Sequence, residues 1–203
     1  MKLIESKTFL NLAKAFAGEC QAHIRYKFIE YGARYNNYKN IATIIDDLVY
    51  NEFNHARMFY TAIQDATKDE ITNIDITSGY PFKQKWDLVE NLRLASEDEK
   101  NEGTKIYPEY ARIAREEGFD DIAMLFENVA KIERDHSSIL ADLHSQMKKN
   151  CLYKKTNNVA WKCSDCGYIA ENKEPWHTCP VCKAERESIV LKCDKAGPKK
   201  QKK

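Results

Sequence analysis

Acidic and histidine side chains interrupt the apolar faces of four predicted helices, and this feature restricts the possible folds more than any other. In the stretch LVYNEFNHARMF (48–59), Leu48, Glu52, His55 and Phe59 fall on one helical stripe. A buried carboxylate without a partner is costly, and five of them would outweigh the net stability of a domain. The sequence therefore predicts a positively charged species, held between inward-facing carboxylates, inside a helical bundle.

The fold class follows from the spacing of the helical segments. Helical periodicity covers four segments: 5–34, 37–67, 83–115 and 119–148. Short breaks around Gly32 and Gly118 join neighbours, whereas the break over 69–82 is long enough to run the length of a bundle. Two helix pairs joined by one long crossover form a ferritin-like four-helix bundle, so we expect a mainly α fold.

The interrupting residues follow one pattern, Glu…Glu-X-X-His, which occurs twice. The two copies are Glu19, Glu52 and His55, then Glu99, Glu133 and His136. Glu and His three positions apart share one helix face. One Glu from each of two helices, with a Glu-X-X-His from each of the other two, is typical of a di-iron or di-manganese carboxylate site. Glu102 adds a fifth carboxylate, and oxygen and imidazole ligands suit iron or manganese better than zinc.

Two other histidines are interpreted differently. His23 lies on the same face as Glu19, but we favour a hydrogen-bonded core histidine, or one that supports a ligand, over a ligand itself. A third Glu-X-X-His, Glu174–His177, contains Pro175 and lies among cysteines. Because proline argues against a helix there, this match is excluded from the metal site.

A second metal site is predicted after the helices. Two Cys-X-X-Cys pairs supply four thiolates, the ligands of a tetrahedral metal cage: Cys163, Cys166, Cys179 and Cys182. Zinc ribbons and iron rubredoxin knuckles share this spacing, and the CGY and CP sequences with nearby aromatic residues favour the iron centre. A segment this small needs a metal, disulfides or a partner to fold. We therefore expect a bundle over 1–149 and a small metal-knuckle domain with short β-strands and a basic tail over 150–203.

Composition excludes several other classes of protein. The net charge of +1 favours no nucleic-acid partner, and the basic cluster after residue 194 is interpreted as a solvated tail. No signal peptide and no membrane span are expected. Seven cysteines, four of them in two pairs, suit metal binding in a reducing compartment, so a cytoplasmic location is expected. Cys20, Cys151 and Cys193 are interpreted as free thiols.

Taken together, these motifs resemble the rubrerythrin family. The resemblance covers residues 3–192 and rests on AFAGECQAHIRY, NEFNHA, SGYPF, ENLRLASEDEKNEGTKIYPEYA, KIERDH and the four-cysteine module, in the family's order. It implies iron in both sites: two ions in the carboxylate and histidine site, and one Fe(Cys)₄ centre of rubredoxin type. It also implies that Glu52 and Glu133 bridge the two irons, with Glu19 and Glu99 as terminal ligands and His136 on the second iron.

The resemblance further implies a change of ligand during turnover. Glu102 would bind the first iron in the oxidised state, and His55 would replace it in the reduced state. Gly103 and Pro108 weaken the helix at this point, and we interpret that softness as what lets Glu102 move. Two tyrosines are implied to hydrogen-bond the ligands, Tyr26 and Tyr107, whereas the residues alone are equally compatible with core tyrosines.

The implied activity is reduction of hydrogen peroxide to water as part of oxidative-stress defence. Electrons would come from a separate NAD(P)H-linked reductase or a rubredoxin, through the Fe(Cys)₄ centre to the di-iron site, in a homodimer or larger homo-oligomer. The alternative is a ferroxidase, iron-storage or oxidase protein of the ferritin-like class, in which the four cysteines hold a structural zinc. The sequence leaves the electron donor and the preference for peroxide or dioxygen open.

Overall fold

The computed structural model describes residues 1–77, 79 and 87–191. Its helices are η1 (Leu3–Glu5), α1 (Lys7–Tyr35), α2 (Lys39–Gln64), α3 (Leu88–Asn101), the π-helix η2 (Glu102–Ile106), α4 (Tyr107–Glu116), α5 (Asp120–Lys148) and η3 (Arg186–Ser188). Its strands are β1 (Val159–Cys163), β2 (Ile169–Asn172) and β3 (Ile189–Leu191). The start of the predicted third helix, most of the SGYPF motif, Cys193 and the basic tail lie outside the described residues.

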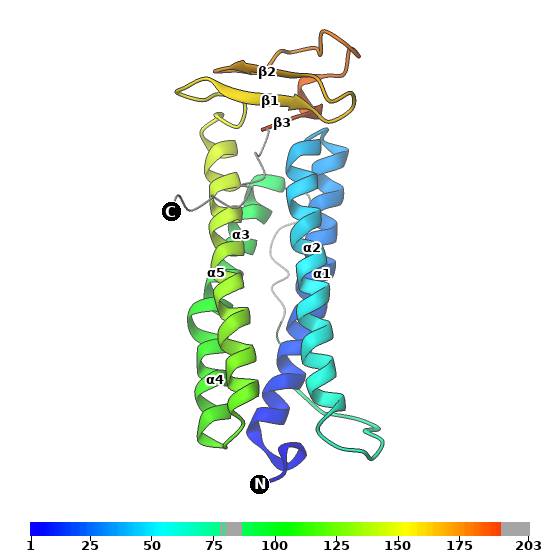
Figure 1. The fold of residues 1–203 in the computed structure, drawn as a ribbon, viewed down its shortest axis with the longest axis vertical. Coiled ribbons are helices and arrows are strands. Elements are labelled where there is room, and N and C mark those ends of the chain that lie inside the picture. The colour runs from blue at the N-terminus through cyan, green and yellow to red at the C-terminus, as the bar shows by residue number, and fades with distance from the viewer. Residues whose placement is uncertain (78, 80–86, 192–203) are drawn as a thin grey trace, which may run out of the picture.

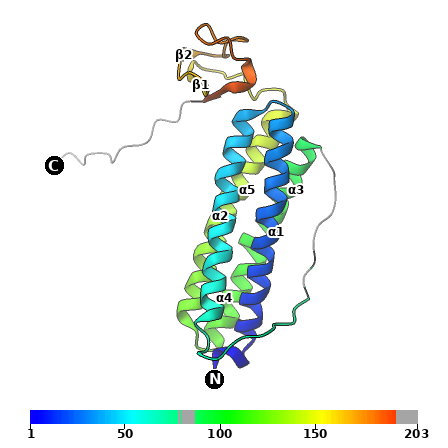
Figure 2. The same cartoon turned by 90° about the vertical axis from the view of Figure 1, so that its right-hand side faces the viewer.

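The helices form one elongated four-helix bundle (Figure 1). α1 packs along α2, and α5 packs along α3 and α4. α2 ends at the N-terminal end of the bundle, and α3 begins at the opposite end (Figure 2). One connection therefore spans the bundle, as the ferritin-like topology requires. The predicted fold class is confirmed. Within the described residues, no helix combines the length and apolarity needed to cross a bilayer.

The apolar core is divided into two clusters, one in each half of the bundle. The cluster nearer the sheet includes Ile29, Ile45, Leu92 and Leu140. The cluster nearer the N-terminus includes Leu12, Phe59, Phe126 and Val129. Four buried acidic residues belong to neither cluster, and along the chain each lies between members of one cluster and members of the other: Glu19, Glu52, Glu99 and Glu133. Apolar packing on both sides therefore holds the acidic layer at mid-length and keeps water away from it.

The third long helix differs from the sequence prediction. Residues 83–115 were expected to form one continuous α-helix, but α3 gives way to a π-helical turn before α4 begins. The N–H of Tyr107 donates to the carbonyl of Glu102, five residues earlier, instead of to Gly103. Pro108 follows directly and has no N–H. The helix thus departs from α geometry at the position where the sequence indicated weakness.

A small sheet covers one end of the bundle. β1 lies between β2 and β3 and is antiparallel to both, with Trp161 opposite Ala170 on one side and Leu191 on the other. Trp161 is 1% exposed and donates its indole N–H to the carbonyl of Asn172 at 3.0 Å. At the junction, Nζ of Lys39 donates to the hydroxyl of Ser188 at 2.9 Å. The start of α2 therefore contacts the cysteine-rich module.

Glu117 closes the other end of the bundle. Its carboxylate accepts hydrogen bonds from the N–H of Lys7 at 3.0 Å, and from the N–H and hydroxyl of Thr8 at 2.8 and 2.6 Å. The first amides of α1 have no acceptor within their own helix. Glu117→Ala should therefore lower the free energy of unfolding by about 1–2 kcal/mol in urea denaturation. Glu116→Ala removes only an exposed ion pair with Arg112 and should cost less than about 0.5 kcal/mol; equal losses would contradict this assignment.

Candidate metal centre

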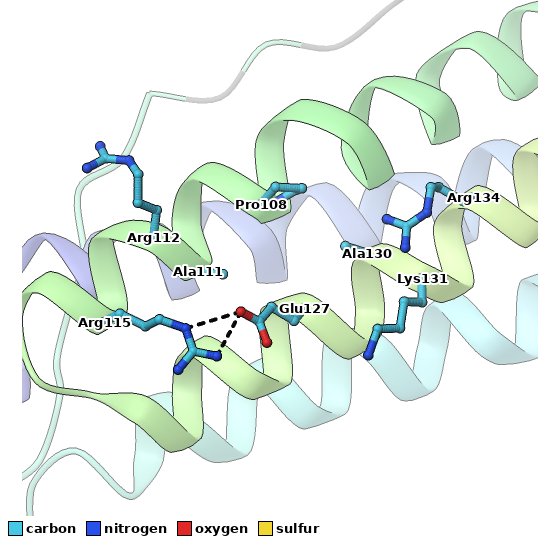
Figure 3. A pocket seen from close by; sticks show the side chains of 8 residues that line it. All are labelled: Pro108, Ala111, Arg112, Arg115, Glu127, Ala130, Lys131 and Arg134. Carbon is cyan, nitrogen blue, oxygen red and sulfur yellow. Dashed lines mark hydrogen bonds and ion pairs between the residues drawn. The ribbon is translucent and has the colours of Figure 1, made fainter.

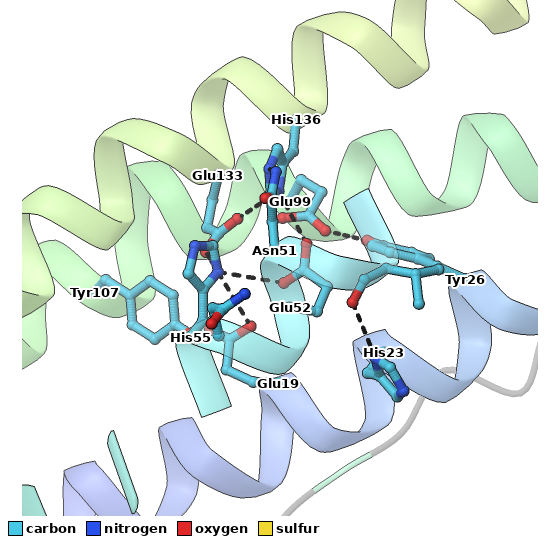
Figure 4. Close-up of polar contacts among 12 residues, drawn as sticks. Glu19, His23, Tyr26, Asn51, Glu52, His55, Glu99, Tyr107, Glu133 and His136 are labelled. Carbon is cyan, nitrogen blue, oxygen red and sulfur yellow. Dashed lines mark hydrogen bonds and ion pairs between the residues drawn. The ribbon is translucent and has the colours of Figure 1, made fainter. Parts of the chain in front are cut away.

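Four helices bring six of the predicted ligands to one buried point. They are Glu19 from α1, Glu52 and His55 from α2, Glu99 from α3, and Glu133 and His136 from α5 (Figure 4). None is more than 3% exposed. Their oxygen and nitrogen atoms form two groups in which all ligand atoms lie within 4.8 Å of one another, and both groups contain Glu52 and Glu133. Side chains from helices in both halves of the chain thus meet at one site.

The two shared carboxylates lie between the two imidazoles. Glu52 places Oε1 2.9 Å from Nδ1 of His136 and Oε2 3.4 Å from Nδ1 of His55. Glu133 places Oε1 2.9 Å from Nδ1 of His55 and Oε2 2.9 Å from Nδ1 of His136. The imidazole rings lie 5.8 Å apart and nearly parallel. Each carboxylate therefore offers one oxygen to each half of the site, as a ligand that bridges two metal ions must.

The oxygen and nitrogen atoms of this site are better placed to bind cations than to form hydrogen bonds with one another. Oε2 of Glu19, Oε2 of Glu99, both oxygens of Glu52 and Glu133, and Nδ1 of both histidines are buried without a hydrogen-bond partner. The short nitrogen–oxygen contacts are therefore close charged contacts that lack the alignment of hydrogen bonds. Burial raises the pKa of Glu19 and Glu99 well above the ordinary value, and neighbouring carboxylates add to the effect. Metal ions would relieve this repulsion and supply the missing partners.

Two tyrosines support opposite ends of the site. The hydroxyl of Tyr26 on α1 donates to Glu99, and the hydroxyl of Tyr107 on α4 donates to Glu19. Both rings are fully buried, at 1% and 2% exposure. Each hydrogen bond occupies one oxygen of its carboxylate, so the other oxygen remains available as a ligand. This arrangement repeats the near two-fold relationship of the two Glu-X-X-His pairs.

Glu102 and His23 lie beside the convergent group. Among the described residues, Glu102 belongs to neither group of converging atoms and is only partly buried at the first position of η2. Burial and the charges of Glu133 and Glu52 raise its pKa to about 8, so its carboxylate lies close enough to interact electrostatically with the site. Nδ1 of His23 contacts the carbonyl of Val49 at 2.9 Å, consistent with a core histidine.

Sequence reasoning missed Asn51. Its side-chain nitrogen lies 3.2 Å from Nε2 of His136, the ring atom opposite the one that faces the carboxylates. Contacts of this kind orient a metal-binding imidazole. Asn51 adjoins Glu52 in the sequence, but this neighbourhood alone does not indicate that its side chain reaches α5. The excluded pair Glu174 and His177 is exposed and lies away from this site.

The four cysteines of the small module also converge. Sγ of Cys163 lies 3.7 Å from Sγ of Cys182, and Sγ of Cys166 lies 3.6 Å from Sγ of Cys179. Metal–sulfur bonds of about 2.3 Å in a tetrahedron require sulfur–sulfur edges of about 3.8 Å. The four sulfur atoms are therefore spaced for one tetrahedral ion. Burial tends to raise the pKa of Cys179, but backbone N–H groups of Cys182 and Val181 bring it to about 6, which favours the thiolate.

Two equivalent turns present these sulfur atoms. Gly167 donates its N–H to the carbonyl of Cys163 at 2.9 Å, and Lys183 donates to Cys179 at 3.0 Å. Both donors have a positive φ, 79° for Gly167 and 66° for Lys183. Glycine adopts this conformation at no steric cost, whereas lysine does not. The Cys-X-X-Cys spacing predicted the two turns, and the left-handed lysine in the second is an additional feature.

Comparison with known proteins agrees with this geometry. A family model described as rubrerythrin matches residues 11–144 and 90–161, and one described as the rubrerythrin rubredoxin-like domain matches residues 161–189. The chain is 37% identical over 177 residues to a rubrerythrin of Clostridium perfringens, which covers 87% of this chain and 90% of that protein. Identity to a rubrerythrin of Porphyromonas gingivalis is 34% over 177 residues, or 87% of this chain and 86% of that protein.

Solved structures show the same fold. A mixed-valence structure of nigerythrin aligns with a TM-score of 0.59 at 22% identity, covering 92% of this chain and 90% of that chain. A bacterioferritin from Desulfovibrio desulfuricans aligns with a TM-score of 0.58 at 20% identity, covering 70% and 81%. The chain therefore belongs to the rubrerythrin family, with a Glu/His di-iron site in its bundle and a four-cysteine rubredoxin-like site in its C-terminal module.

Proposed function

We propose that this protein reduces hydrogen peroxide to water, with electrons delivered to the di-iron site through the rubredoxin-like centre. Two ferrous ions held in this site would supply the two electrons needed to cleave the O–O bond, and two protons would complete two molecules of water. The observation that carries the proposal is the pair of carboxylates, Glu52 and Glu133, each with one oxygen toward each imidazole. They would hold two metal ions close enough to act on one peroxide.

In this proposal the ligand set comprises seven residues. They are Glu19, Glu52, His55, Glu99, Glu102, Glu133 and His136. The surplus of carboxylates would balance the added charge when both ions become ferric, and the apolar clusters on either side exclude water. Tyr26 and Tyr107 would keep the terminal carboxylates oriented by donating to them. Together these residues would hold the bridging and terminal carboxylates in place.

Glu102 and His55 are proposed to exchange as ligands of the first iron. The arrangement described here matches the histidine-bound form, since His55 lies among the converging atoms and Glu102 lies outside them. Glu102 begins a π-helical turn, and such turns often occur where a helix carries a functional side chain. We therefore assign the exchange to a rotation of the Glu102 side chain on this turn, toward the site on oxidation and away on reduction.

The assembly is proposed to be a homodimer or larger homo-oligomer in the cytoplasm. The cysteine module lies beyond the start of α2, and thirteen residues of helix, about 20 Å, separate that start from Glu52. Because electron tunnelling slows exponentially with distance, we propose that the module delivers electrons to the bundle of a second copy. Exposed aromatic residues on α1 and α2, with Phe28 at 60% and Phe53 at 52% exposure, offer a surface for that contact.

Stopped-flow absorption tests the activity directly. The protein is reduced anaerobically and mixed with hydrogen peroxide or, separately, with dioxygen, and the return of the red Fe(Cys)₄ absorption is followed. We expect peroxide to reoxidise the centre at least about tenfold faster than dioxygen, because the site supplies two electrons at once. Equal or faster reaction with dioxygen would instead indicate a ferroxidase or oxidase.

Colour provides the control for the metal in the cysteine module. An Fe(Cys)₄ centre is red through charge transfer from thiolate to iron, whereas zinc is colourless. A colourless protein, prepared with iron available during expression, would contradict the proposed electron path. It would leave the alternative of a ferritin-like protein with a structural zinc site.

A further inference from the structure

Arg134 lies outside the metal site, and its guanidinium contacts the helix turn that carries Glu102. Nη1 of Arg134 donates a hydrogen bond to the carbonyl of Gly103 at 2.7 Å. The side chain lines a surface groove of about 390 Å³ between α4 and α5 (Figure 3). Two other arginines in this groove, Arg112 and Arg115, pair with carboxylates. Arg134 instead reaches a backbone carbonyl, so its role differs from that of its neighbours.

The Gly103 carbonyl has no donor within its own helix. In an α-helix its partner would be the N–H of Tyr107, but that group donates to Glu102. In a continued π-helix its partner would be the N–H of residue 108, and Pro108 has none. A carbonyl left without a partner at a buried residue is costly. The guanidinium of Arg134 replaces the donor that the π-helical turn and the proline together remove.

The same residues also set the distance between η2 and α5. A Cβ atom at Gly103 would lie 2.8 Å from the carbonyl oxygen of Ala130 and 2.8 Å from Cγ of Arg134. Real Cβ atoms essentially never approach so closely, so a side chain at this position would push the two helices apart. Gly103 is therefore required by the close contact with α5, in addition to its effect on helix propensity. Arg134 therefore both restricts the space at Gly103 and donates a hydrogen bond to its carbonyl.

We propose that Arg134 is a positioning residue that fixes the π-helical turn of residues 102–106. It acts from the outer surface of the bundle, through the carbonyl of Gly103, on the segment that begins with Glu102. Its consequence for turnover rests on the proposed function, since only there does Glu102 exchange with His55. The fixed turn itself does not depend on that function and can be measured separately.

Hydrogen–deuterium exchange on the full-length, iron-loaded protein tests this role. Arg134→Met keeps an apolar stem but removes every donor, and it should speed amide exchange within residues 101–108 by about tenfold. Lys131→Met is the matched control, because Lys131 is a cation of the same helix and groove that donates to Asn128 and, among the described residues, makes no hydrogen bond to Gly103. Arg134→Lys, which retains a donor, should restore much of the protection.

Unchanged exchange in Arg134→Met, or an equal increase in Lys131→Met, would overturn the proposal. An equal increase in peptides of α1 and α2 would also overturn it, because that would indicate general destabilisation. Peroxide turnover is measured on the same samples. Faster exchange at 101–108 with unaltered turnover would support the role of Arg134 and count against the proposed exchange of Glu102.

A double substitution checks the chemical reason. Pro108→Ala supplies an N–H at the position from which a π-helical bond to Gly103 could form. In that background Arg134→Met should change exchange by no more than about twofold, because the carbonyl has a second donor. A full tenfold effect in both backgrounds would show that the carbonyl of Gly103 is not the group through which Arg134 acts, and would overturn the proposal.

Discussion

Glu52→Ala is expected to abolish iron binding in the bundle while the cysteine module stays red. Glu52 directs one oxygen to each imidazole, so its loss removes a ligand from both halves of the site at once. Partners that merely orient ligands are worth about 10–100-fold in affinity or activity. Loss of a shared ligand should therefore reduce peroxide turnover by at least about 100-fold. Iron analysis should find only the iron of the four-cysteine site.

Asp47→Ala is the matched control for this prediction. Asp47 lies on the same helix, five residues before Glu52, but its side chain is exposed and lies away from the site. The Asp47→Ala variant should bind iron and turn over peroxide as the unmodified protein does. If Glu52→Ala retained a full complement of iron, the bridging role given to Glu52 would be wrong. If the variant lost the red colour as well, the two metal sites would not be independent.

The sequence predicted the bundle and most of its site because both depend on helical periodicity. A carboxylate at a seam position of an amphipathic helix must point inward, whatever the neighbouring helices do. The structure brings together six of the seven predicted ligands on this basis. The four cysteines converge for a similar reason, because Cys-X-X-Cys turns are local structures that present paired sulfur atoms.

The sequence did not predict how the third helix departs from α geometry. Gly103 and Pro108 indicated weakness there, but a weak helix can bend, fray or adopt a π turn. The choice depends on contacts with α5, namely the approach of Ala130 and the hydrogen bond from Arg134. Such contacts join residues about thirty positions apart, and periodicity within one helix cannot reveal them. Asn51 was missed for the same reason.

Glu102 illustrates the consequence of this difference. Continued α-helical spacing from Glu99 would place Glu102 on the same face, one turn further along. The π-helical turn begins at that residue, and Glu102 lies at the border of the site instead of among its converging atoms. Its charge still interacts with Glu133 and Glu52. The proposed exchange of Glu102 with His55 would start from this position at the border of the site.

Metal-free protein is expected to lose stability as pH rises from 5 to 8. Burial and neighbouring carboxylates raise the pKa of Glu102 from 4.5 to about 8, and burial raises the pKa of Glu19 and Glu99 as well. The folded state then binds more protons than the unfolded chain throughout this window, so the free energy of unfolding falls with pH. We expect a decrease of about 2–4 kcal/mol in urea denaturation.

The histidines reinforce this direction, and Glu52 does not oppose it. Although burial alone would lower it, the carboxylates of Glu133, Glu19 and Glu52 raise the pKa of His55 to about 12. The folded state therefore keeps a proton that the unfolded chain releases above about pH 6.5. Despite burial, the imidazoles of His136 and His55 lower the pKa of Glu52 to about 2. Its stabilising contribution is lost only below about pH 4.5, outside this window.

Iron should reverse the trend, because metal binds the deprotonated ligands and releases their protons. The iron-loaded protein should therefore be at least as stable at pH 8 as at pH 5. Glu102→Gln, which cannot ionise, should reduce the slope of the metal-free protein but not remove it, because Glu19 and Glu99 still contribute, whereas Glu97→Gln on the exposed face of α3 should leave it unchanged. A metal-free protein that gained stability from pH 5 to 8 would show that the buried carboxylates do not retain their protons.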